Sequence, residues 1–186
     1  MPTMFIFGLG YSAGHIAKDL RARGWDVLST GSSGTMAFDD AASVRLGLAS
    51  ATHVLSSVPP VADGDPVLNT YGDVLKTRPD LWLGYLSSTG VYGDAGGAWV
   101  DESAPIKGRR GGRNEADAEW LSRGARVFRL PGIYGPGRSA LDRVREGKAH
   151  RIDLPDQVFS RVHVDDIAGG VIAALSMVEV ISSRPL

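Results

Sequence analysis

The chain has no cysteine among its 186 residues, so disulfides and thiolate zinc sites are excluded. The four histidines, His15, His53, His150 and His163, are scattered, and their spacing predicts no metal site. Long apolar runs are also missing: none approaches the roughly 20 residues that span a bilayer. The first residues lack the pattern of a signal peptide. We therefore expect a cytoplasmic protein with no metal and no membrane partner.

An excess of charge of one sign is lacking too, because 20 basic and 21 acidic residues leave a formal net charge of -1. A nucleic-acid partner is not expected, since it requires a strong basic excess. The one basic cluster, Lys107 to Arg113, is interpreted first as a solvated loop, with a phosphate or substrate contact as the alternative. The hydrophobic share of 43% is typical of a globular chain, and the length suits one α/β domain.

Short apolar runs alternate with helical patterns along the chain. The sequence predicts strands at residues 4–7, 25–29, 53–58, 82–88, 125–130 and 159–164. Helices are predicted between Gly10 and Gly24 and at residues 66–78, 114–123, 139–146 and 165–178, with Asn114 and Asp165 as caps. This alternation predicts a Rossmann-type, doubly wound α/β fold, in which helices cover both faces of a mostly parallel sheet.

A glycine-rich turn follows the first predicted strand directly and matches the pattern G-x-G-x-x-A. The first glycine permits the tight turn, the second lets the backbone approach a diphosphate, and the small residue at the last position lets helix and strand pack closely. The helix that begins here presents unpaired N–H groups and its positive dipole end to the phosphates. The turn therefore predicts a dinucleotide site formed by Gly8, Gly10, Tyr11, Ser12, Ala13 and Gly14.

The loop after the second predicted strand bears on which dinucleotide is bound. An NAD site usually has a carboxylate about 20 residues beyond the glycine turn, where it holds the ribose hydroxyls. Residues 29–33 contain no acid, and Ser32 and Ser33 offer hydroxyl donors instead. We therefore expect NADP or NAD as the cofactor, with a slight preference for NADP. The NAD(P)-binding domain is predicted over residues 1–178, followed by an atypical tail at 179–186.

Three further segments complete a family pattern. They are Leu86–Gly93 (LSSTGVYG), Arg129–Gly137 (RLPGIYGPG) and Arg161–Ala168 (RVHVDDIA). Together with the glycine turn they resemble the extended short-chain dehydrogenase/reductases, the NAD-dependent epimerase/dehydratase family. The resemblance covers nearly the whole chain, and the motifs occur in the family's order. Residues 55–68 further resemble an atypical bacterial branch of that family.

The resemblance implies hydride transfer at a substrate carbinol, often on a nucleotide-linked sugar. Ser88 matches the Ser or Thr that hydrogen-bonds the reacting oxygen in the family. Backbone around Pro131 and Ile133 is expected to lie against the nicotinamide carboxamide. Ser57 and Val58, in the segment that resembles the atypical branch, are assigned to the cofactor site as well.

One departure from the family concerns its Tyr-x-x-x-Lys motif, which moves the carbinol proton. No tyrosine occurs between Tyr92 and Tyr134. With Trp120 taken as the register mark of the atypical branch, Arg109 and Arg113 stand at the Tyr and Lys positions. Arg113 is therefore predicted to take over the ribose-binding and charge role of the lysine. Arg109 is unsuited to be a general base, because a guanidinium does not deprotonate near neutral pH.

A second departure lies at the C-terminus. Members of the family continue well past the last predicted helix, so the resemblance implies that the substrate lid is largely missing here. Its absence would expose apolar surface on that helix at Val171, Ile172 and Leu175, and such a surface favours a homodimer.

Three interpretations of function remain open at this point. The first is a NAD(P)-dependent oxidoreductase of the epimerase/dehydratase type that acts on a small-molecule substrate, with Tyr11, Tyr134 or His163 as the remaining proton carriers. The second is a redox-inactive NAD(P)H-binding sensor, which the missing tyrosine favours. The third is a defective product without activity. The retained Ser88 segment favours the enzyme, since a sensor has no need of it.

Overall fold

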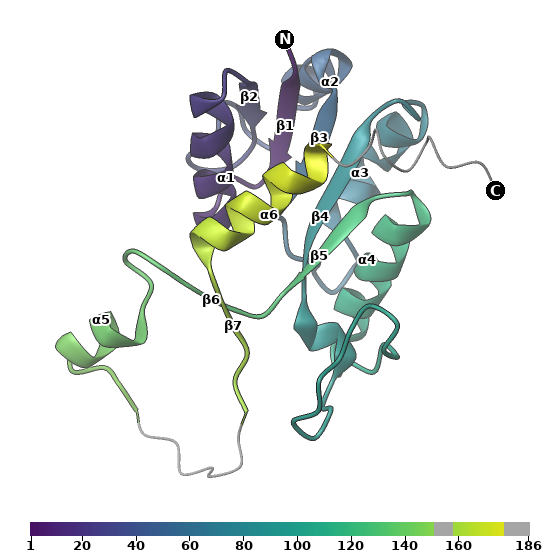
Figure 1. The fold of residues 1–186 in the computed structure, drawn as a ribbon. Coiled ribbons are helices and arrows are strands. Elements are labelled where there is room, and N and C mark those ends of the chain that lie inside the picture. The colour runs from purple at the N-terminus through teal and green to yellow at the C-terminus, as the bar shows by residue number, and fades with distance from the viewer. Residues whose placement is uncertain (151–157, 177–186) are drawn as a thin grey trace.

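Five parallel strands form the central sheet of the computed structural model, which describes residues 1–150 and 158–176 (Figure 1). They stand in the order β2-β1-β3-β4-β5 and comprise β1 (Thr3–Phe7), β2 (Asp26–Ser29), β3 (His53–Ser56), β4 (Trp82–Ser88) and β5 (Arg126–Leu130). The chain turns from β2 to the other side of β1 when it enters β3. This reversal creates a crevice at the carboxyl ends of β1 and β3, where ligands bind in doubly wound sheets.

Helices cover both faces of this sheet, as the sequence predicts. They are α1 (Tyr11–Ala22), α2 (Ala41–Ser50), α3 (Pro66–Lys76), α4 (Gly111–Ser122), α5 (Ala140–Arg145) and α6 (Val164–Ser176). Alternate residues of β1 serve the two faces: Met4 and Ile6 pack with α1 and α6, whereas Phe5 and Phe7 pack with α2, α3 and α4. Every residue of β1 is buried, which is the burial expected of a parallel strand covered on both sides.

A small outlying unit stands apart from the main sheet. The short strands β6 (Gly132–Tyr134) and β7 (Arg161–His163) pair in parallel, and α5 lies beyond them, away from the body of the fold (Figure 1). No residue of α5 is buried. The helix begins instead with a capping box, in which Ser139 and Asp142 satisfy each other's backbone N–H groups.

Two buried side chains join α3, α4 and β4. The carboxylate of Asp65 caps α3 by accepting the N–H groups of Val67 and Leu68, at 2.9 and 3.0 Å. Its second oxygen accepts the indole N–H of Trp120 on α4, at 2.9 Å. The Trp120 ring in turn stacks on Tyr85 of β4 at a centroid distance of 5.5 Å. Burial raises the pKa of the Tyr85 phenol, so the group stays neutral in the core.

The structure corrects the predicted helix boundaries. The helix α4 begins at Gly111 with Arg110 as its cap residue, so Asn114 lies inside the helix and is not the cap. The last part of the basic cluster, 111–113, is accordingly helical and not loop. The helix α6 begins at Val164, which places Asp165 in the first turn instead of at the cap.

Other expectations differ from the structure in position or burial. The helix α2 and the strand β6 were not predicted. Val171 is fully buried against α1, and Ile172 and Leu175 are partly buried in the same cluster, so the exposed surface expected on the last helix is wrong for Val171.

The expected homodimer stays a prediction, and the proposed tail at 179–186 lies outside the described residues. No helix within 1–150 or 158–176 is long and apolar enough to span a bilayer.

Gly47 explains why α2 can lie so close to the sheet. A Cβ at this position would be 2.7 Å from the Phe5 ring, which is itself fully buried. We expect Gly47→Ala to lower the free energy of unfolding by about 1–3 kcal/mol, the usual effect of an added methyl in a packed core. The matched control is Gly170→Ala on α6, where a Cβ meets nothing within 4 Å. It should raise stability by about 0.5–1 kcal/mol. Urea unfolding measures both, and a stabilising Gly47→Ala would contradict the close approach.

Candidate functional site

The glycine turn is clamped between the ends of β2 and β3. Gly8 has a φ of +82°, a conformation that glycine adopts without strain. The backbone N–H of Leu9 donates to the Thr30 carbonyl at 2.8 Å, which ties the turn to the end of β2. The Ser57 hydroxyl donates to the Gly8 carbonyl, and a Cβ on Gly8 would be 3.0 Å from the Val58 side chain. Ser57 and Val58 therefore support the glycine turn on the side that faces the end of β3.

The outer side of the same turn is open. A Cβ on Gly10 would meet nothing within 4 Å, so this surface has room for a ligand to contact the backbone. The first intrahelical hydrogen bond of α1 runs from the Gly14 N–H to the Gly10 carbonyl. The N–H groups of Tyr11, Ser12 and Ala13 precede that bond, and α1 has neither a side-chain cap nor an acid in its first turn. Free N–H groups and an open glycine surface fit a diphosphate.

The third position of the motif serves packing. Ala13 is 1% exposed and lies in the core cluster with Met4 and Ile6, so a larger side chain would push α1 off the sheet. The loop after β2 contains Ser32 and Ser33, both exposed. No carboxylate occurs in this loop before Asp39.

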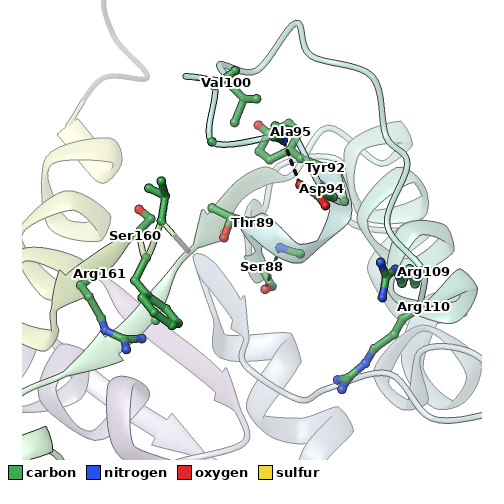
Figure 2. Close-up of a pocket in the computed structure, with 18 of the residues that line it drawn as sticks. Ser88, Thr89, Tyr92, Asp94, Ala95, Val100, Arg109, Arg110, Ser160 and Arg161 are labelled. Carbon is green, nitrogen blue, oxygen red and sulfur yellow. Dashed lines mark hydrogen bonds between the residues drawn. The ribbon is translucent and has the colours of Figure 1, made fainter. Parts of the chain in front are cut away.

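A cavity of about 1030 Å³ lies at the carboxyl end of β4, beyond the glycine turn (Figure 2). Ser88 and Thr89 are in its wall, together with Tyr92 from the 3₁₀ turn η1 (Thr89–Tyr92). The Ser88 hydroxyl oxygen accepts the Gly90 N–H at 3.1 Å and so caps η1. Its own hydrogen is left to donate to a ligand. Ser88 can therefore cap the turn and contact a substrate at the same time.

Arginines form the other walls of the cavity. Arg109 and Arg110 come from the loop that leads into α4, Arg113 comes from the first turn of α4, and Arg161 comes from β7. Figure 2 shows Arg109 and Arg110 across the cavity from Arg161. The structure thus brings together Ser88 and Arg113, the two residues predicted to be catalytic, although their roles stay predictions.

Other predicted residues lie around the cavity or away from it. Gly132 lines it, but its neighbour Ile133 packs against the cluster beneath α1 and α6, and Pro131 is partly buried at the end of β5. Tyr134 and His163 contact each other at a ring distance of 5.0 Å, outside the residues that line this cavity. Tyr11 likewise lies outside it and donates to the Pro136 carbonyl.

A buried ion pair fixes the elements that border the cavity. Asp117 of α4 and Arg129 of β5 are 1% and 13% exposed, and their closest contact is 2.7 Å. The Asp117 carboxylate also accepts the Ser87 hydroxyl at 2.6 Å. Arg129 donates to the Tyr92 phenol oxygen at 3.0 Å and lies over its ring. The hydrogen bond with Asp117 is the main reason why the pKa of Arg129 is raised, and the guanidinium is always charged.

Sequence reasoning missed this ion pair, although α4 carries a signal of it. Ala116, Asp117 and Trp120 lie on the buried face of α4, so a carboxylate stands among apolar positions at helical spacing. A buried carboxylate requires a cation or donors nearby. The partner, Arg129, is twelve residues away on the next strand, and the spacing alone does not identify it.

Solved structures of other proteins share this architecture. The chain is 36% identical to a functionally unknown conserved protein from Silicibacter pomeroyi; the match covers 95% of this chain and 68% of that protein, with a TM-score of 0.80. A dTDP-glucose 4,6-dehydratase from Bacillus anthracis, in complex with NAD, is 15% identical, with coverage of 94% and 71% and a TM-score of 0.74. A human epimerase family protein with NADPH is 19% identical, with coverage of 92% and 70% and a TM-score of 0.62. No protein-family model and no curated protein matches the chain.

The buried ion pair gives a stability prediction. Asp117→Ala leaves the Arg129 guanidinium without its carboxylate in a largely buried place, and we expect a loss of about 3–5 kcal/mol in the free energy of unfolding. Glu119→Ala is the matched control on the same helix, because Glu119 forms an exposed pair with Arg123. Its loss should stay below about 1 kcal/mol. Denaturant unfolding measures the free energy of unfolding of both variants. Equal losses of stability would show that the pair of Asp117 and Arg129 contributes no more than an exposed ion pair.

Proposed function

The chain belongs to the extended short-chain dehydrogenase/reductases, the NAD-dependent epimerase/dehydratase family, and on this basis we propose that it is a nicotinamide-dinucleotide-dependent oxidoreductase of the epimerase or dehydratase type. One observation carries the proposal. An open helix N-terminus at Gly10 and a cavity that contains Ser88 lie at the same edge of one parallel sheet. A dinucleotide and a substrate can meet along that edge.

The strand register supports a single crevice. Phe7 is paired with Ser56, and Ser56 with Tyr85, so β4 continues three residues beyond the level of Phe7, in the direction of the crevice, before it ends at Ser88. The glycine turn and Ser88 are therefore separated by two strand spacings, roughly 10 Å, across the sheet and by roughly 7 Å along the strands. A nicotinamide ribose that extends from a diphosphate at the turn can cross this distance. Its reactive ring would then lie at the cavity.

NADP is the cofactor that we favour. The dehydratase and the human epimerase family protein hold NAD and NADPH respectively, so the shared fold accepts both. The loop after β2 has no carboxylate to repel a 2′-phosphate, and Ser32 and Ser33 are exposed there as donors.

The residues around the cavity suggest how the chemistry is divided. The nicotinamide, when bound, supplies the hydride transfer. Ser88 donates its hydroxyl hydrogen to the reacting oxygen of the substrate, and Arg113 interacts with the cofactor ribose in place of the family's lysine. Arg109 binds charge and moves no proton, because its guanidinium stays protonated. The proton carrier is therefore a group other than a Tyr-x-x-x-Lys tyrosine.

A sensor of NAD(P)H is the second candidate function. The observation in its favour is that no tyrosine occurs between Tyr92 and Tyr134. With Trp120 as the register mark, Arg109 and Arg113 are assigned to the family's tyrosine and lysine positions. A protein that binds reduced cofactor without turnover needs the glycine turn but not Ser88.

Cofactor binding tests the glycine turn. We expect NADPH and NADH to bind with a change in nicotinamide fluorescence. Gly10→Val should weaken binding on the order of 100-fold or more, because the side chain blocks at least two charge-assisted N–H contacts. Gly169→Val is the matched control, since a Cβ there also meets nothing within 4 Å. If Gly10→Val binds as the wild type does, the cofactor site is elsewhere.

Turnover separates the enzyme from the sensor. Nucleotide-linked sugars and related carbinols are screened for a change in nicotinamide absorbance. Ser88→Ala should lower kcat on the order of 100-fold, as expected for the loss of a donor to a reacting oxygen, while NADPH affinity stays unchanged. Ser139→Ala, which also removes a capping serine but on α5, is the control. Tight NADPH binding with no turnover of any compound in the panel would support the sensor.

A further inference from the structure

His163 lies directly before the first residue of α6 and caps this helix with its ring. The helix begins at Val164, and the backbone N–H of Asp165 donates to Nδ1 of His163 at 3.3 Å. A side chain at this position accepts the N–H of the second or third helical residue, a role that serine, threonine, asparagine and aspartate usually take. Because Nδ1 is the acceptor here, it carries a lone pair, and the proton of the neutral ring is on Nε2.

The carboxylate of Asp165 lies between two histidines from different elements. Its Oδ1 is 3.0 Å from Nδ1 of His15 on α1, and its Oδ2 is 3.6 Å from Nδ1 of His163 on β7. An ionised carboxylate only accepts hydrogen bonds, so Nδ1 of His15 carries the proton of that hydrogen bond. The distance to His163 is too long for a hydrogen bond. While both rings are neutral, they are therefore in opposite tautomers.

This histidine cluster is the joint between the main sheet and the outlying unit. The helices α1 and α6 pack on the same face of the sheet, whereas His163 belongs to β7 and its ring contacts Tyr134 of β6 at 5.0 Å. A Cβ on Gly135 would be 3.4 Å from Nε2 of His163 and 2.6 Å from the Tyr11 phenol oxygen. Gly135 thus lies between the histidine and the first turn of α1. A change in the hydrogen bonds of His163 therefore affects both parts of the molecule.

A second proton on His163 is incompatible with its present hydrogen bond. With a proton on each nitrogen the ring has no acceptor, so the N–H of Asp165 loses its partner. A cation at the N-terminus of a helix is also disfavoured by the helix dipole. The carboxylate of Asp165 offers an alternative, because a small movement brings Oδ2 within hydrogen-bond distance of the same nitrogen. His163 therefore has two arrangements, as acceptor from a backbone N–H and as donor to a carboxylate.

Titratable and charged groups surround His163 on every neighbouring element. They are Asp165 and Asp166 on α6, Tyr11 and His15 on α1, Tyr134 on β6, Arg138 in the loop after β6, where it lies over the Tyr11 ring, and Arg161 on β7 itself. Of these residue types, only histidine normally changes its charge between about pH 5 and pH 8. A change of pH in this range therefore acts on the cluster through its histidines.

We propose that His163 is a proton-operated switch at the start of α6. The neutral ring caps the helix and so holds β7 to it. When Nδ1 takes a proton from solvent, the ring releases the Asp165 N–H and donates to the Asp165 carboxylate instead. His15 keeps its hydrogen bond to Oδ1 in both states, so α1 and α6 stay joined. Arg161, two residues earlier on β7, lines the cavity, so the switch determines how firmly this wall of the cavity is held.

NMR of the isotope-labelled chain without added cofactor tests the switch. At about pH 8 we expect the imidazole nitrogens to show the proton on Nε2 in His163 and on Nδ1 in His15. At about pH 5 both rings should carry two protons. The protection of the Asp165 amide against exchange with water should then be about 5–10-fold lower than at the higher pH, as expected for the loss of one hydrogen bond.

Two substitutions isolate the two states. His163→Asn places an amide oxygen at the position of Nδ1, so the Asp165 amide should stay protected at both pH values. His163→Phe keeps a ring against Tyr134 but has no acceptor, so this amide should be unprotected at both. The His163 side chain is 30% exposed, so both variants should fold. His150→Asn is the matched control, since His150 is an exposed histidine outside the cluster, and it should respond to pH as the wild type does.

Three results would overturn the inference. A proton on Nδ1 of His163 at about pH 8 would mean that this nitrogen does not accept the Asp165 N–H. Equal protection of the Asp165 amide at both pH values in the wild type would mean that protonation does not release it. A loss of protection in His163→Asn as large as in the wild type would assign the change to another group. None of these measurements involves NADPH or turnover, so they leave the proposed function untouched.

Discussion

The ion pair between Asp117 and Arg129 is the contact on which the substrate side of the molecule depends. Asp117 belongs to α4 and also binds Ser87 of β4, while Arg129 belongs to β5 and also holds Tyr92 of η1. The elements α4, β4, β5 and η1 are therefore joined through one buried ion pair, and all of them except β5 contribute residues to the cavity lining. Burial makes the pair costly to break, since either charge left alone would be desolvated without compensation. The position of Ser88, directly after Ser87, is fixed by this arrangement.

The ion pair and the glycine turn divide the crevice into two ends with different chemistry. At the turn, the backbone forms the site. Gly8 adopts the positive φ that the turn requires, Gly10 leaves room for a ligand to approach, and the first turn of α1 provides N–H donors. At the cavity, side chains form the site: within 1–150 and 158–176 its four arginines form no ion pair, whereas Arg129 is paired with Asp117. A buried arginine needs a carboxylate to be tolerated. Arg109, Arg110 and Arg161 are exposed, so water can hydrate their guanidinium groups without a carboxylate partner.

The sequence predicted the parts of this site that are local in the chain. The glycine turn occupies seven consecutive residues, and the strand before it and the helix after it follow from adjacent apolar patterns. The helix α2 escaped prediction because its small residues and Gly47 weaken the apolar periodicity, and Gly47 is there for contact with Phe5. The strand β6 has three residues, and its pairing with β7 is a long-range contact. The placement of Arg161 around the same cavity as Arg109, Arg110 and Arg113 is also a long-range contact, so local spacing in the sequence does not predict it.

The lack of a tyrosine between Tyr92 and Tyr134 also bears on the choice between enzyme and sensor. A sensor has to recognise a dinucleotide, and the glycine turn is sufficient for that purpose. The cavity with Ser88 in its wall is a second site, and its four arginines form no ion pair within residues 1–150 and 158–176. A protein that binds nothing beyond its cofactor has no reason to keep it. The cavity beside Ser88 therefore favours the enzyme, which has to bind a substrate in addition to its cofactor.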